Sequence, residues 1–279
     1  MLHDFQNLFE YYYSLWIQND ILIYGIGPVL SFIIGYFFTA IPLEILIRQS
    51  WVSSYLVTYP GSHSNSRMLS IEKTQKNISI YTQFFHSNHS AFNNLFGFNA
   101  ILSGVCSYYI FKSILPTPDA ISIYPEVSQA IIQYCALHVI GDFILYWGHR
   151  VQHDIPYLWE HCHSVHHALE TPTPLSAIYI HHIDAFLQGS LPILLSTAIV
   201  QPHIFIWYLS IALRIAENTA NHSGLSGLVF DCVTLKVLPF RASASHHDSH
   251  HKYSHYGRNA KNYGEFYWIW DYIFGTMRV

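Results

Sequence analysis

The sequence has few charged residues and no excess of basic ones. Of its 279 residues, 11% are charged and 51% are apolar, whereas an average soluble domain is about 25% charged. The 13 Lys and Arg stand against 17 Asp and Glu, for a formal net charge of -4. Without a basic face, binding to nucleic acid is disfavoured. The low charge content also argues against a soluble or disordered chain.

Cysteine is scarce too, and its positions do not predict a disulfide framework. The four residues, Cys106, Cys135, Cys162 and Cys232, form no CxxC pair. Cys106 and Cys135 fall in apolar stretches, where a disulfide framework is not expected. The HExxH motif of zinc proteases is also missing from the sequence,.

Long apolar runs dominate the sequence instead. They cover residues 21–47, 95–115, 130–148 and 185–216, and about 20 apolar residues suffice for a helix to cross a bilayer. The last run contains Pro192 and Pro202, so it fits either one tilted helix or a two-helix hairpin that enters and leaves the same leaflet,. We therefore expect an all-α integral membrane bundle of about four spans, or of spans plus hairpins.

The positions of Lys and Arg predict which side of the membrane each loop faces. Residues 1–20 contain neither, whereas the segment after the first run carries Arg48, Arg67, Lys73 and Lys76. The segment after the third run has Arg150, and the tail after residue 235 has six more. Since basic residues favour the cytosolic side, the N-terminus is predicted outside and the segments after the first and third runs, with the tail, in the cytosol.

Histidine is the most unusual feature, with 20 copies against 13 Lys and Arg together. Three groups have helical spacing, in which residues three or four apart share a face. They are His149 and His153; His163, His166 and His167; and His247, His250 and His251. Each group lies on the predicted cytosolic side, so we expect a helical, histidine-rich cap there that binds metal.

Eight imidazoles exceed what one tetrahedral zinc ion needs. They fit a site with two metal ions of higher coordination number, and imidazole suits iron, zinc, copper and nickel. Asp142 lies seven residues before His149, on the same helical face, and an acid inside a membrane span is a functional candidate,. We expect Asp142 to hydrogen-bond a ligand histidine; the alternative is a pair with His138, one turn earlier.

The second half of the chain resembles the fatty acid hydroxylase/sterol desaturase superfamily of membrane di-iron enzymes. The resemblance rests on DFILYWGHRVQH, HCHSVHH and HHDSHH, and on NYG, WD and FGT near the C-terminus. The segment TPTPLSAIYIHHIDAFLQGSLP, with His181, Asp184 and Gln188, is similar to sterol C5-desaturases. ENTANHSG, with His222, looks like the hydroxylase and C4-methyl oxidase branch.

The resemblance implies N-terminal membrane helices and a polar loop over residues 1–128, followed by a catalytic domain over residues 129–279. It implies two iron ions, O2 and an external electron donor of the cytochrome b5 or reductase type. It adds His222 as a ninth metal ligand, and His181 as a further ligand or a residue supporting one. The active site would face the cytosol, in the endoplasmic reticulum of a eukaryote or the inner membrane of a bacterium.

The expected activity is O2-dependent hydroxylation or desaturation of a lipid that enters from the bilayer. A sterol is the favoured substrate, on the resemblance alone, with fatty-acyl, sphingolipid and alkylglycerol substrates as alternatives. Two other classes stay open, a divalent-metal transporter and a zinc-dependent membrane hydrolase. A transporter would place its ligands at the middle of several spans, whereas these groups lie at the ends of apolar runs.

Overall fold

The computed structural model describes residues 2–49, 51–58, 67, 71–73, 78–85, 88–115, 125–254 and 259–278. Within these ranges the regular structure is helical, and β-pairing is limited to two isolated bridges, Leu56 with Leu225 and Arg241 with Tyr267. The all-α prediction is confirmed. The division into residues 1–128 and 129–279 stays a prediction.

Among the described residues, three helical segments are long and apolar enough to cross a membrane. The first joins η1 (Ile21–Ile26), which is π-helical, to α2 (Gly27–Arg48). The second is α7 (Val127–Asp154), and the third joins α10 (His182–Asp184), η6 (Ala185–Ser190) and α11 (Leu191–Val200). The run at residues 95–115 forms α6 (Phe98–Ile114), a 17-residue helix that packs against η1. The protein is thus an integral membrane helical bundle.

The apolar run at residues 185–216 forms a helical hairpin rather than one long helix. Its first arm ends at Val200, Gln201 takes a left-handed backbone with φ of 48°, and α12 (Ile204–Asn221) runs back. Asp184, before the hairpin, contacts His163, and His222, after it, contacts His166. Since His163 and His166 are neighbours in the chain, both ends of the hairpin return to the same place.

Helix α12 lies directly against α2, and a glycine makes this approach possible. A Cβ atom on Gly35 would lie 2.2 Å from the backbone oxygen of Ala212. Only glycine allows two helix backbones so close. The core beside this contact is aromatic: Trp207 is fully buried and meets Phe111 of α6 edge to face, with 4.8 Å between ring centroids.

One stripe of α2 faces outward and is entirely apolar: Leu30, Ile34, Phe38, Ile41 and Ile45. The side chains recur at helical spacing, and Phe38 is 78% exposed. In a membrane-spanning helix such a stripe meets lipid hydrocarbon, while the opposite face packs against the rest of the bundle.

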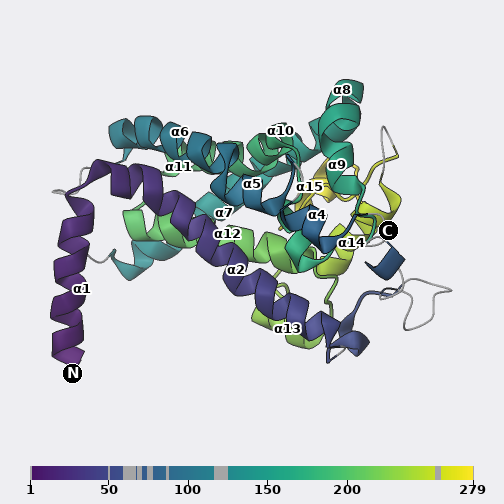
Figure 1. Cartoon of the computed structure of the whole chain (residues 1–279), viewed down its shortest axis with the longest axis horizontal. Coiled ribbons are helices and arrows are strands. Elements are labelled where there is room, and N and C mark those ends of the chain that lie inside the picture. Colours follow the sequence, from purple (N-terminus) through teal and green to yellow (C-terminus); the bar gives the residue numbers. More distant parts are fainter. Residues whose placement is uncertain are drawn as a thin grey trace.

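Shorter helices form a cap at one end of the bundle. In Figure 1 this cap lies at the end with the C-terminus, and α1 (Leu2–Ile17) lies at the opposite end. The cap includes α8 (Pro156–Leu158), η4 (Trp159–His163), α9 (Ser164–His167), η5 (Pro174–Ile178), α13 (Leu228–Val233), α14 (Ala244–Tyr253) and α15 (Ile269–Ile273). The N-terminal half adds η2 (Ser53–Tyr55), α4 (Ile80–Phe84) and α5 (Ala91–Phe96). The predicted histidine groups all lie in or next to this cap.

Candidate metal centre

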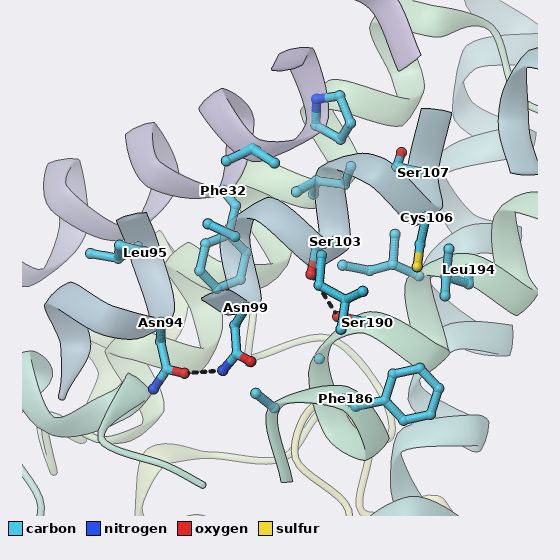
Figure 2. Close-up of a pocket in the computed structure, with 18 of the residues that line it drawn as sticks. Phe32, Asn94, Leu95, Asn99, Ser103, Cys106, Ser107, Phe186, Ser190 and Leu194 are labelled. Carbon is cyan, nitrogen blue, oxygen red and sulfur yellow. Dashed lines mark hydrogen bonds between the residues drawn. The ribbon is translucent and has the colours of Figure 1, made fainter. Parts of the chain in front are cut away.

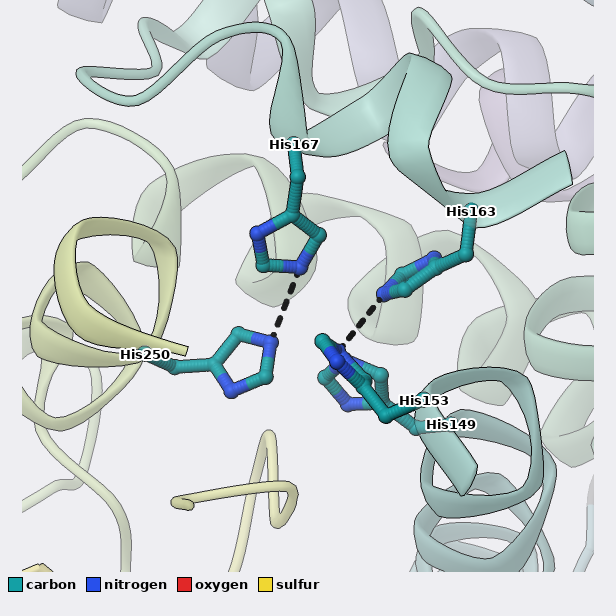
Figure 3. Close-up of side chains that lie close together, drawn as sticks. All are labelled: His149, His153, His163, His167 and His250. Atoms are coloured by element: carbon teal, nitrogen blue, oxygen red, sulfur yellow. Dashed lines mark hydrogen bonds between the residues drawn. The ribbon is translucent and has the colours of Figure 1, made fainter. Parts of the chain in front are cut away.

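The structure gathers nine histidines into two buried clusters. We call the first, made of His149, His153, His163, His167 and His250, the five-histidine cluster. The second, the four-histidine cluster, consists of His166, His222, His247 and His251. In each cluster one ring nitrogen per histidine lies within 4.8 Å of all the others. Figure 3 shows the five rings converging from three different segments of the chain. The nine are the residues that the sequence predicts as metal ligands.

Helical spacing explains how each predicted group serves the clusters. His149 and His153, four apart near the end of α7, point to the same cluster. In the second group, His163 and His167 are four apart and share that cluster, whereas His166 points to the other. In α14 the pair His247 and His251 faces the four-histidine cluster, and His250 faces the first. Two groups therefore supply both clusters, which makes the clusters neighbours.

The contacts between the rings do not fit ordinary hydrogen bonds. In the four-histidine cluster, Nε2 of His222 lies 3.1 Å from Nε2 of both His166 and His247. Nδ1 of His222 is 2.8 Å from the backbone oxygen of Asn218, so the single proton of a neutral ring is on Nδ1. Nε2 then presents a lone pair toward the other rings, an arrangement that a cation stabilises.

The five-histidine cluster has the same chemistry. Nδ1 of His149 donates to the Tyr263 backbone oxygen at 2.9 Å, and Nδ1 of His250 to that of Lys261 at 2.7 Å. Their Nε2 atoms point inward, and that of His149 has no hydrogen-bond partner among the described residues. Nε2 of His250 lies 3.1 Å from that of His167. Two nitrogens ~2.1 Å from one metal ion and at right angles to each other are about 3 Å apart, so both clusters fit metal ions.

Burial keeps these rings neutral. It lowers the pKa of His166, His167, His247, His250 and His251 well below the usual value, because a charged ring would lose its hydration,. The pKa of His222 falls to about 4 for the same reason. Neutral imidazoles are the form that binds metal, so the folded chain presents its donors ready for coordination.

Asp184 is a functional residue that the sequence predictions of the site leave out. Its Oδ2 accepts a hydrogen bond from Nδ1 of His163 at 2.8 Å, and both side chains are buried. Its Oδ1 accepts from the side-chain amides of Gln152, at 3.1 Å, and Gln188, at 2.6 Å. A carboxylate behind a histidine fixes the tautomer and orientation that a metal needs. The only sequence signal is the position of Asp184 in the segment similar to sterol desaturases.

The predicted role of Asp142 is wrong. Its carboxylate accepts hydrogen bonds from the backbone N–H groups of Phe266 and Tyr267, at 3.2 and 3.1 Å, and from the indole of Trp270, at 3.0 Å. None of the hydrogen bonds that the described residues make to it comes from a histidine. Asp142 therefore holds the C-terminal segment against α7. The alternative partner, His138, pairs instead with Glu217 at 3.3 Å.

His181 belongs to neither cluster. Its Nδ1 accepts a hydrogen bond from the Ile183 backbone N–H at 3.2 Å, and its ring lies against those of His182 and His89. The structure thus gives it the role of capping the short helix α10. Next to the third histidine group, His246 also stays outside, with Nε2 at 3.1 Å from Asp271.

Comparison with known proteins agrees with this geometry. Residues 134–276, half of the chain, match the family described as fatty acid hydroxylase. The very-long-chain aldehyde decarbonylase GL1-11 of Oryza sativa subsp. indica is 33% identical over 203 residues, which cover 68% of this chain and 71% of that protein. The methylsterol monooxygenase 2-2 of Arabidopsis thaliana is 28% identical over 263 residues, 92% of this chain and 87% of that protein. No solved structure matches.

The chain belongs to the fatty acid hydroxylase/sterol desaturase superfamily. Since its relatives include monooxygenases and decarbonylases of lipids, this fatty acid hydroxylase family member is a membrane oxidoreductase that acts on lipids. The methylsterol monooxygenase 1-2 of Arabidopsis thaliana, at 32% identity over 165 residues, covers 59% of this chain and 50% of its own length.

The bundle of this fatty acid hydroxylase family member contains an apolar cavity, which we call the outer cavity. It lies between α2, α6, η6 and α12. Figure 2 shows its lining, in which Phe32, Leu95, Phe186 and Leu194 supply apolar surface. Few polar groups reach it, and two of these, the hydroxyls of Ser103 and Ser190, bind each other at 3.3 Å. A cavity of this kind takes the hydrocarbon part of a lipid.

A second cavity, which we call the inner cavity, lies between the outer cavity and the histidines. Six residues line both cavities: Phe32, Ile178, Ile180, Gly189, Ile193 and Ile211. At its inner end lie His166 of the four-histidine cluster and the carboxylate of Asp184. The lining also includes Arg214, Asn218 and Glu265. The two cavities thus adjoin, and together their linings extend from the apolar interior of the bundle to the candidate metal centre.

Proposed function

We propose that this protein is an O2-dependent di-iron enzyme that hydroxylates or desaturates an unactivated C–H bond of a lipid. The observation that carries the proposal is the pair of buried histidine clusters, one of which borders the inner cavity beside the apolar outer cavity. Five and four imidazoles together exceed the needs of a tetrahedral zinc ion and suit two ions of higher coordination number.

In this proposal each histidine cluster holds one iron ion. When bound, the two ions use O2 and external electrons to supply the oxidising power that an unactivated C–H bond requires. The chain supplies the rest. Backbone oxygens of Tyr263, Asn218 and Lys261 and the carboxylate of Asp184 hold the ring protons on Nδ1. The complete burial of the nine rings excludes bulk water from the reacting centre.

We favour a sterol as the substrate. The alignment with a methylsterol monooxygenase spans nearly the whole chain, including the helices that line the outer cavity. A long-chain aldehyde or fatty-acyl lipid is the second candidate, which similarity to aldehyde decarbonylases favours. In both cases the lipid would enter from the bilayer, with its hydrocarbon part in the outer cavity.

The active site, in this proposal, faces the cytosol. The basic residues Arg48, Arg67 and Arg150 lie at the same end of the bundle as the histidines, and residues 1–20 at the other end have no Lys or Arg,. A cytosolic electron donor of the cytochrome b5 or reductase type would dock on this end. In a eukaryote the membrane would be that of the endoplasmic reticulum; in a bacterium, the inner membrane.

Metal analysis of detergent-purified protein, expressed with iron supplied, tests the proposal. We expect about two iron ions per chain, coupled to each other in the Mössbauer spectrum. Zinc outranks Fe(II) in affinity for imidazole, so zinc-loaded protein is stripped and reconstituted with iron before it is judged. One zinc ion, or no stoichiometric metal after reconstitution, would contradict the proposal in favour of a hydrolase or transporter.

A further inference from the structure

Glu265 is a buried acid that belongs to neither histidine cluster. Its side chain is 3% exposed and lines the inner cavity together with His166. It lies between the NYG and WD motifs near the C-terminus. The next residue, Phe266, donates a hydrogen bond from its backbone N–H to Asp142. A buried ionisable group next to a reacting centre is a candidate for a functional role.

Two amides of α12 fix Glu265 in place. The side-chain amide of Asn218 donates to Oε1 of Glu265, and that of Asn221 donates to its backbone oxygen at 2.9 Å. The backbone oxygen of Asn218 also accepts the hydrogen bond from Nδ1 of His222. One residue, Asn218, therefore links the carboxyl group of Glu265 to His222 of the four-histidine cluster.

The second carboxyl oxygen of Glu265 has room for a ligand. Within the described residues, no hydrogen bond reaches Oε2, although the side chain is almost fully buried. Arg214 lines the same cavity but is used elsewhere: its guanidinium donates to the Gly141 backbone oxygen at 3.3 Å and lies over the ring of Phe266. Since Glu265 lines the inner cavity and this oxygen has no hydrogen-bond partner among the described residues, Oε2 is a candidate for contact with the substrate.

The chemistry of this position selects a hydroxyl group. Burial raises the pKa of Glu265 to about 8, so both of its protonation states are accessible near neutral pH. A hydroxyl both donates and accepts, and therefore binds either state, whereas a carbonyl binds only the protonated one. An anionic substrate would meet the acids Glu265 and Asp142 beside the one guanidinium that, among the described residues, lines the inner cavity, that of Arg214.

We infer that Glu265 binds a hydroxyl group on the lipid and thereby places a nearby carbon at the four-histidine cluster. The lipid enters with its polar end first, and its hydrocarbon part stays in the outer cavity. The oxidised C–H bond is then close to the hydroxyl rather than far along an alkyl chain. This inference rests on the proposed function, since it assigns the part of the substrate that the same site recognises.

Binding of paired lipids to the iron-loaded, detergent-purified protein tests the inference. The probes are a tritiated 4-methylsterol and its 3-deoxy form, and octadecanol and octadecane. We expect wild-type protein to bind the alcohol of at least one pair about 10-fold more tightly than its deoxy partner. Glu265→Leu should abolish this preference by weakening the alcohol alone, and Glu265→Gln, which keeps a polar amide there, should retain most of it.

Two further variants separate recognition from folding. Asn218→Ala keeps the backbone contact of residue 218 with His222 but removes the amide that binds Oε1 of Glu265. This variant should keep its metal, while its preference for the alcohol over the deoxy lipid should fall several-fold. Glu44→Gln changes a buried acid of α2 that lines neither cavity, and should keep the wild-type preference. The inference is overturned if the wild type binds alcohol and deoxy lipid equally in both pairs. It is also overturned if Glu265→Leu keeps the full wild-type preference for the alcohol. If iron is still bound, the proposed function stands; absence of iron refutes that function separately.

Discussion

The carboxylate of Asp184 lies 2.8 Å from Nδ1 of His163, and both side chains are almost completely buried. This contact joins the start of the α11–α12 hairpin to the second histidine group, 21 residues earlier. Since Gln152 of α7 also donates to Asp184, one carboxylate ties three segments together directly behind the five-histidine cluster. The proposed metal ligand His163 is thus oriented by the same residue that positions the hairpin lining the two cavities.

Removing this carboxylate should weaken one metal site more than the other. In Asp184→Ala, His163 loses the acceptor that holds its proton on Nδ1, and loss of such a partner lowers metal affinity by roughly 10–100-fold. We expect the iron content to fall toward one ion per chain, with the four-histidine cluster still loaded. Glu170→Ala, which changes an exposed acid near the same histidine group, should keep the wild-type content. Equal iron content in both variants would argue against the assigned role of Asp184.

Two histidines of the second group offer a direct test of the ligand assignment. His163 is buried in the five-histidine cluster, and His161, two residues earlier, is exposed with its ring against Tyr157. His163→Ala should lose metal from its cluster, so that the content falls from about two ions to about one, and turnover of lipid should stop. His161→Ala should retain both. Elemental analysis and a product assay on the same preparations decide, and full turnover in His163→Ala would refute the assignment.

The local parts of this site were accessible from sequence. Residues four apart on a helix share a face whatever the rest of the chain does, so the pairing of His149 with His153 follows from spacing alone. The distribution between two clusters does not. His166 joins a different cluster from His163 and His167 because the two clusters lie on different sides of α9. The positions of the clusters depend on where α12 and α14 pack.

The polar partners of the site could not be predicted for a related reason. Spacing suggested that Asp142 meets a histidine on its own helix, yet its carboxylate binds backbone N–H groups more than 120 residues away. Arg67 likewise forms a buried ion pair with Asp248, which lies in the third histidine group. Such contacts cross the fold, and neither residue has a local sequence signal that identifies its partner.

Asp142 should matter for stability rather than for chemistry. Asp142→Ala leaves two buried backbone N–H groups and one indole N–H without their acceptor, and we expect the free energy of unfolding to fall by about 3 kcal/mol. Thermal unfolding in one detergent measures the effect, with Asp154→Ala at the exposed end of the same helix as the control. The variant that remains folded should still bind wild-type amounts of iron. Unchanged stability would show that the C-terminal segment is held by other contacts.

Gly189 lies where the outer and inner cavities meet, and it offers a way to close the path without touching the metal. It lines both cavities, and a Cβ atom added to it would have no heavy atom within 4 Å. Gly189→Ala should therefore have little effect on turnover. The larger side chain of Gly189→Leu would fill the space through which the lipid passes. We expect kcat/KM for the lipid to fall at least about 100-fold, because a lipid held back at Gly189 cannot place its C–H bond at the histidines, and a misplacement of about 1 Å already costs that much.

Iron content distinguishes a blocked path from a damaged centre. Because Gly189 is in η6 and none of the nine histidines is, Gly189→Leu should bind as much iron as the wild type and as Gly189→Ala. Binding of the tritiated sterol should be lost in parallel with turnover. If Gly189→Leu turns over lipid at the wild-type rate, the two cavities are not the route to the histidines, and the substrate must reach them from the cap.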